Sequence, residues 1–169
     1  MAETRLADIS AAAADADLLD RITSAAAAAG VAGALFGNEP APASPVPMMI
    51  VHGVRDQVVG FDGGPSPMAF VARSQSRPFM PVRYAVDFWA RADGCRTVAT
   101  EPADGNAEVV VEVHGRCRAG SEVVFYRLAS ATHIWPGATN VMRMLETTPY
   151  RAFDATPAIW AFFQRHARP

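Results

Sequence analysis

Short apolar runs bounded by proline and glycine predict buried strands in this chain. Residues 48–51, Met-Met-Ile-Val, lie between a proline and a nearby glycine. A continuous apolar run of this length is typical of a strand buried on both faces of a parallel sheet. Residues 109–113 and 123–126 are rich in β-branched and aromatic side chains, and a segment with two glycines joins them. This pattern predicts a β-hairpin.

Two segments carry apolar residues at helical spacing. Pro81 suits the first position of a helix, and Gly94 is a natural stop. The apolar face between them consists of Val82, Ala85, Val86 and Trp89. A second helix is expected near the end of the chain, with Pro157 in its first turn and either Asp154 or Thr156 as its cap.

Alanine dominates residues 1–37, where a helix and a strand are expected. Intrinsic propensity favours helix over 1–20. Residues 24–35 are ambiguous, because glycines interrupt them and a buried strand of small residues fits equally well. Residues 38–47 form a Pro-rich connection, and 48–169 hold the remaining elements.

The mixed order of strand, helix, hairpin and helix predicts a single α/β domain over residues 1–169. Between the apolar strand at 48–51 and the helix that follows Pro81, residues 60–81 are rich in proline and glycine. This composition predicts a long surface loop that has room for one short turn of helix.

Composition agrees with a globular domain, because 50 % of the residues are hydrophobic and 19 % are charged. The formal charge of -2 gives no reason to expect nucleic acid or an anionic membrane as a partner. The sequence contains no run of about 18 bulky apolar residues, so no membrane span is predicted. The polar start of the sequence predicts no signal peptide there. No motif calls for a cofactor or metal. Cys95 and Cys117 are either free thiols or a disulfide, since their spacing fits no zinc pattern.

Two ionisable side chains come just after the predicted strands. Asp56 follows Val51 by five residues, and His133 follows the strand that ends near Leu128. Catalytic groups in open α/β sheets collect at the carboxyl ends of strands. Asp56 can orient an imidazole there, and His133 can move a proton as the base of a triad. Alternatively, Asp56 bonds its own backbone in a turn and His133 only lines a pocket. Trp135 suits the wall of an apolar acyl or aryl pocket, although core packing explains it equally well.

The third member of such a triad has no candidate. Hydrolase triads of this type run nucleophile, acid, base, so a serine should precede Asp56. The chain has no Gly-x-Ser-x-Gly, and no serine lies in a strand–turn–helix context. Cys95 follows the acid and lies at a helix end that disfavours a thiolate. Of the other histidines, His52 is less promising as a base, and those at 114 and 166 are expected to be solvated.

Several segments together resemble a known family. They are His52-Gly-Val-Arg-Asp56-Gln-Val-Val, Phe61-Asp-Gly-Gly64, Phe88-Trp89-Ala-Arg-Ala-Asp-Gly-Cys95, Cys117-Arg-Ala-Gly-Ser-Glu-Val-Val-Phe-Tyr126, His133-Ile-Trp-Pro-Gly137, and Phe153-Asp-Ala155 with Ile159-Trp-Ala-Phe-Phe163 and His166. In order and spacing they are similar to the C-terminal half of polyhydroxybutyrate depolymerase-like and feruloyl esterase-like serine hydrolases, over roughly residues 46–166.

This resemblance implies a partial α/β-hydrolase fold, the C-terminal half of a mostly parallel sheet with flanking helices and a hairpin. It implies that Asp56 is the acid, that His133 is the base and that Cys95 pairs with Cys117. It also implies a carboxylic ester hydrolase acting through an acyl-enzyme on small esters or polyesters, with a secreted or periplasmic location.

The chain departs from the family pattern at two places. Residues 129–132, Ala-Ser-Ala-Thr, stand where the family has glycines before the histidine. Residues 1–7 look like the helix after the nucleophile, so the serine is expected just upstream of Met1, together with the first strands. The chain is then expected to be inactive alone. Its open sheet edge is expected to bind an N-terminal half or a second copy. The rivals are a split hydrolase, a non-catalytic binding or scaffold remnant of the fold, and a cysteine hydrolase using Cys95.

Overall fold

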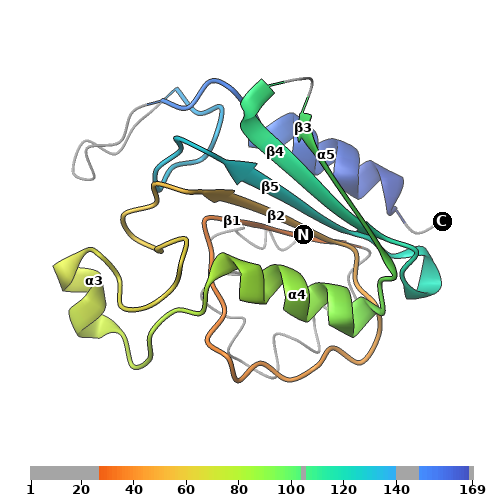
Figure 1. Cartoon of the computed structure of the whole chain (residues 1–169), viewed down its shortest axis with the longest axis horizontal. Coiled ribbons are helices and arrows are strands. Elements are labelled where there is room, and N and C mark those ends of the chain that lie inside the picture. Colours follow the sequence, from red (N-terminus) through yellow and green to blue (C-terminus); the bar gives the residue numbers. More distant parts are fainter. Residues whose placement is uncertain (1–26, 104–105, 140–148, 168–169) are drawn as a thin grey trace, which may run out of the picture.

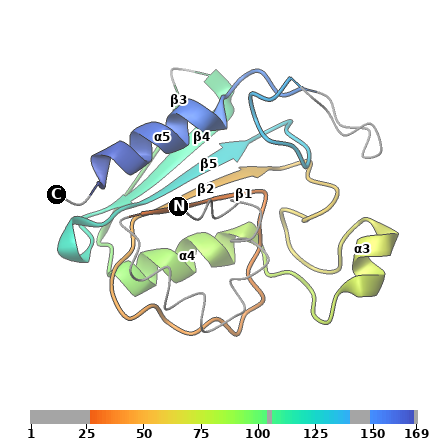
Figure 2. The same ribbon diagram turned by 180° about the vertical axis from the view of Figure 1, so that it is seen from behind.

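The computed structural model describes residues 27–103, 106–139 and 149–167. The expected helix over 1–20 lies outside them. The strands are β1 (Ala28–Val31), β2 (Met48–Gly53), β3 (Thr97–Ala103), β4 (Asn106–Gly115) and β5 (Val123–Leu128). The helices are α3 (Ala69–Ser74), α4 (Val82–Asp93) and α5 (Ala155–Arg165), with a short 3-10 turn η1 (Arg118–Gly120). The five strands form one sheet in the order β1-β2-β5-β4-β3. Helix α4 covers one face of the sheet and α5 the other (Figures 1 and 2), so the predicted α/β class is confirmed.

The predicted buried strand lies in the parallel part of the sheet. β2 is buried along its whole length and pairs in parallel with β1 on one side and β5 on the other. The ambiguous Ala-rich segment contains a strand, β1. Small side chains suit it because Ala28 and Ala29 pack in the two opposite cores. Among the described residues, β1 has a partner strand on one side only.

The other half of the sheet is antiparallel. β5 pairs antiparallel with β4 as the predicted hairpin, and β4 pairs antiparallel with β3. The sheet is therefore mixed, and the expectation of a mostly parallel sheet is wrong for the described residues. The sequence does not predict β3, because its residues are nearly all exposed and include Pro102, so they lack the usual alternation.

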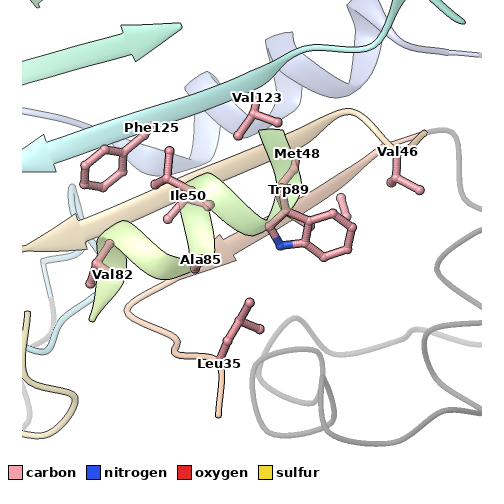
Figure 3. Packing of buried hydrophobic residues seen from close by; sticks show 11 residues of the cluster. Leu35, Val46, Met48, Ile50, Val82, Ala85, Trp89, Val123 and Phe125 are labelled. Atoms are coloured by element: carbon pink, nitrogen blue, oxygen red, sulfur yellow. The ribbon is translucent and has the colours of Figure 1, made fainter. Parts of the chain in front are cut away.

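Helix α4 forms as its apolar spacing predicts. All four predicted positions are buried (Val82, Ala85, Val86 and Trp89), and Gly94 ends the helix in a left-handed conformation with φ 67°. Pro81 stands one residue before the helix, as its N-cap, and not at its first position. Figure 3 shows this helix packed on alternate residues of β2 and β5, namely Met48, Ile50, Val123 and Phe125.

The opposite side chains of the same strands form a second core under α5. Met49 and Val51 of β2 pack there with Ile159 and Phe162 of the helix. Of the two expected caps of α5, the structure shows Asp154, whose side chain accepts from the N–H two residues further on at 3.0 Å. Within the described residues, no helix is both long and apolar enough to span a membrane.

A disulfide between Cys95 and Cys117 ties the end of α4 to the connection between β4 and β5. The pairing implied by the family resemblance is therefore present, and neither cysteine is a free thiol. A hydrolase using Cys95 as its nucleophile is excluded in this oxidised form. The bond joins residues 22 apart in the sequence.

Removing this disulfide should lower stability without changing the fold. For the double variant Cys95→Ser/Cys117→Ser we expect a loss of about 3 kcal/mol, because the unfolded chain regains the entropy of the open loop. The melting temperature should fall by about 10 °C. Calorimetry of the variant and of reduced wild type, each compared with oxidised wild type, measures this loss. If both samples melt at the same temperature as oxidised wild type, the prediction is contradicted.

Asp93 at the end of α4 is a fully buried carboxyl group. Its Oδ1 accepts from the Val46 N–H at 3.1 Å, and its Oδ2 accepts from the Ser121 hydroxyl. Burial raises the pKa of Asp93 above its ordinary value of 3.8, against the opposing effect of these hydrogen bonds. The side chain thus joins the helix to the segments before β2 and β5.

The amide variant of Asp93 should be tolerated and the alanine variant should not. Asp93→Asn keeps an acceptor for Val46 and a donor for Ser121, whereas Asp93→Ala leaves both unpaired and should cost about 2 kcal/mol. Because the folded pKa is raised, the contribution of Asp93 to stability is greatest below pH 3.8 and declines as pH rises through the folded pKa. Denaturant unfolding at several pH values tests this, and equal losses in both variants would contradict it.

Candidate active site

The segments that follow β2 and β5 lie together at the carboxyl ends of these two parallel strands. Gly53 is opposite Leu128 in the register. Beyond it, the Val54 N–H donates to the Leu128 carbonyl at 2.9 Å, and the Arg55 N–H donates to the Ala131 carbonyl at 3.1 Å. The chain thus continues the pairing past the sheet and brings the two predicted functional residues together.

Asp56 and His133 form a hydrogen-bonded pair. The Nδ1 atom of His133 lies 2.9 Å from Oδ2 of Asp56. The carboxylate is wholly buried, whereas 29 % of the histidine side chain is exposed. Because an ionised carboxylate only accepts, we assign the proton to Nδ1. This leaves Nε2 of His133 as the nitrogen that can accept a proton from a reacting group.

The other oxygen of Asp56 holds the turn that carries it. Oδ1 accepts from the backbone N–H groups of Val58 and Val59, both at 2.8 Å. Both interpretations of Asp56 from the sequence therefore apply: one oxygen bonds its own turn, and the other orients the histidine. A carboxylate fixed in this way presents Oδ2 in one direction.

Trp135 packs against the core under α5. Its indole Nε1 donates to Thr156 Oγ1 at 2.9 Å, and its ring joins the α5-side cluster. Packing is therefore the role that the structure shows. Next to it, the Pro136 carbonyl accepts from the Ala155 N–H at 3.1 Å, which fastens the segment after His133 to the start of α5.

Four serine hydroxyls of the described residues are bonded away from His133. They are Ser66 to the Val58 carbonyl, Ser74 to the Phe70 carbonyl, Ser121 to Asp93 and Ser130 to Glu108. These hydrogen bonds agree with the sequence, in which no serine has the context of a nucleophile. Among the described residues, no group of three or more His, Cys, Asp or Glu side chains could hold a metal ion.

The expectation that the histidines at 114 and 166 are solvated is wrong. His114 is buried, with Nε2 2.6 Å from Glu112, and the pKa of Glu112 is lowered chiefly by its hydrogen bond to Arg83. His166 is partly buried and lies 2.9 Å from Glu122. The burial of His114 depends on neighbouring strands, and the partner of His166 is 44 residues away in the chain, so spacing alone does not reveal either environment.

His52, which the sequence makes a less promising base than His133, is a neighbour of the site. It is fully buried, and its Nε2 lies 3.5 Å from Asp56 Oδ2. Burial lowers the pKa of His52 below 6.5, although the Val59 carbonyl and Asp56 act in the opposite direction. The sequence signal for this contact is a histidine that lies four residues before a candidate acid, in an otherwise apolar strand.

Comparison with known proteins leaves this site without an assigned family. No family model matches the chain, and no curated protein matches it. What the site can do is therefore inferred from its own residues and their geometry.

Proposed function

We propose that Asp56 and His133 are the acid and base of a carboxylic ester hydrolase of the polyhydroxybutyrate depolymerase/feruloyl esterase type. The observation that carries the proposal is the 2.9 Å contact between His133 Nδ1 and a buried carboxylate whose second oxygen is held by two backbone amides. This is the arrangement that lets a histidine act as base and then as acid.

The order of the strands supports a partial α/β-hydrolase fold for this proposal. In it, β1, β2 and β5 are the parallel strands that follow the nucleophile, with the acid after β2 and the base after β5. The disulfide between Cys95 and Cys117 agrees with the secreted or periplasmic location of the resembling family.

The proposal requires a serine from outside the 169 residues, on the same polypeptide or on a separate one. In the reaction, His133 Nε2 takes the serine proton as the oxygen attacks the ester carbonyl. The imidazolium then gives that proton to the departing alcohol, which leaves an acyl-enzyme. Water, activated by the same nitrogen, releases the acid and restores the serine. Asp56 stabilises the imidazolium at each step.

The rival function is a non-catalytic binding or scaffold protein with the same fold. The specific observation that favours it is the lack of Gly-x-Ser-x-Gly in the sequence. The two functions differ in what they require of His133, because a scaffold does not need an imidazole there.

Hydrolysis of a p-nitrophenyl ester separates these functions. The DNA immediately 5′ of the Met1 codon is read in frame for Gly-x-Ser-x-Gly, and the serine-bearing polypeptide is expressed with this chain, fused or separate. Turnover that needs both parts and His133 supports the hydrolase. A complete polypeptide with the serine present and no turnover on short or aryl esters would count against it.

A further inference from the structure

The buried His52 contacts both the acid and the turn that carries it. It lies in β2, four residues before Asp56, and its side chain has no exposed surface. Its Nε2 is 2.9 Å from the Val59 carbonyl and 3.5 Å from Asp56 Oδ2. A carbonyl oxygen can only accept, so Nε2 carries a proton and donates it. Burial, which lowers the pKa of His52, keeps the ring neutral.

This donor closes the turn that Asp56 begins. The Val59 N–H donates to Asp56 Oδ1, and the carbonyl of the same residue accepts from His52 Nε2. The Val58 carbonyl accepts in turn from the Ser66 hydroxyl at 2.6 Å. With these bonds the turn from 56 to 59 is tied to side chains of the interior, so Oδ2 of Asp56 has little freedom to turn away from His133.

We propose that His52 is a positioning residue, whose Nε2–H fixes the Asp56 turn and aims Oδ2 of that carboxylate at His133. Its importance for catalysis rests on the proposed function, but the positioning itself does not. Because it is buried, His52 does not touch substrate. A residue that only filled space beside Phe61, whose ring centroid is 6.0 Å away, would be replaceable by an apolar side chain of similar size.

Two substitutions in the full 169-residue chain test this role. His52→Leu fills the space without a donor, whereas His52→Gln places an amide N–H near the position of Nε2. We expect the Val58 and Val59 amides to exchange with solvent about tenfold faster in His52→Leu, the equivalent of about one hydrogen bond, and to stay protected in His52→Gln. His166→Gln, which changes a histidine bound to another carboxylate, is the matched control.

The nitrogen NMR spectrum of His133 gives a readout that simple packing would not move. The Nδ1–H tautomer should dominate in wild type and His52→Gln and be lost in His52→Leu. Unchanged exchange and an unchanged His133 tautomer in His52→Leu would overturn the proposal. If that variant does not fold, the wild-type spectrum still decides, because His52 found with its proton on Nδ1 would also overturn it. Absence of esterase activity in the complete, serine-bearing protein would contradict the proposed function and leave these signals intact.

Discussion

Replacing His133 by alanine should lower kcat for ester hydrolysis by about 10⁶ in the complete, serine-bearing protein. The reason is that Nε2 of His133 is the group that removes the serine proton and returns it to the leaving alcohol. Asp56→Asn should lower kcat by about 10⁴, because an amide cannot stabilise the imidazolium and can favour the wrong tautomer. Steady-state kinetics on a p-nitrophenyl ester measure both losses.

The control for this prediction is His166→Ala. His166 is also a histidine bonded to a carboxylate, Glu122, but it lies at the end of α5, away from the pair. Its removal should leave kcat within about a factor of two. Comparable activity in His133→Ala and wild type would show that the pair does no catalysis.

Gly53→Ala should disrupt the fold where the segments that follow β2 and β5 lie together. A Cβ on Gly53 would lie 2.2 Å from the Ala131 carbonyl oxygen and 2.6 Å from its carbon. These are backbone atoms, so the strand ends have to move apart. We expect a loss of about 3 kcal/mol in the free energy of unfolding. The Arg55 N–H donates to the same carbonyl, so moving Ala131 away also moves the two segments apart. The Asp56–His133 contact between these segments should then be lost as well.

Gly30→Ala is the matched control for this steric prediction. Gly30 lies in β1 of the same sheet, and a Cβ there would have no atom within 4 Å. The free energy of unfolding of the Gly30→Ala variant should differ from that of wild type by less than about 0.5 kcal/mol. Denaturant unfolding of both variants measures the difference, and equal stability of Gly53→Ala and wild type would contradict the close approach.

The elements with a regular pattern could be predicted from the sequence. The continuous apolar run predicts β2, and the i, i+3, i+4, i+7 spacing predicts α4 with Gly94 at its end. Asp56 and His133 could be placed near each other because the ends of neighbouring parallel strands lie together. These are local or topological inferences that need no knowledge of side-chain packing.

Other features could not be predicted from the sequence because they depend on contacts across the fold. β3 is an exposed edge strand, so burial imposes no alternation on it. The contacts of His52 with Val59 and Asp56 form only once the turn is closed. The interior position of His114 depends on the neighbouring strands, which no spacing rule identifies.

Labelling with a fluorophosphonate tests the central claim most directly. This probe reacts with a serine that a neighbouring base has activated. In the complete protein we expect rapid labelling of the serine in wild type and His166→Ala, and almost none in His133→Ala and Asp56→Asn. Equal labelling in wild type and His133→Ala, or none in a folded, serine-bearing wild-type protein, would contradict the assignment of Asp56 and His133 as catalytic acid and base.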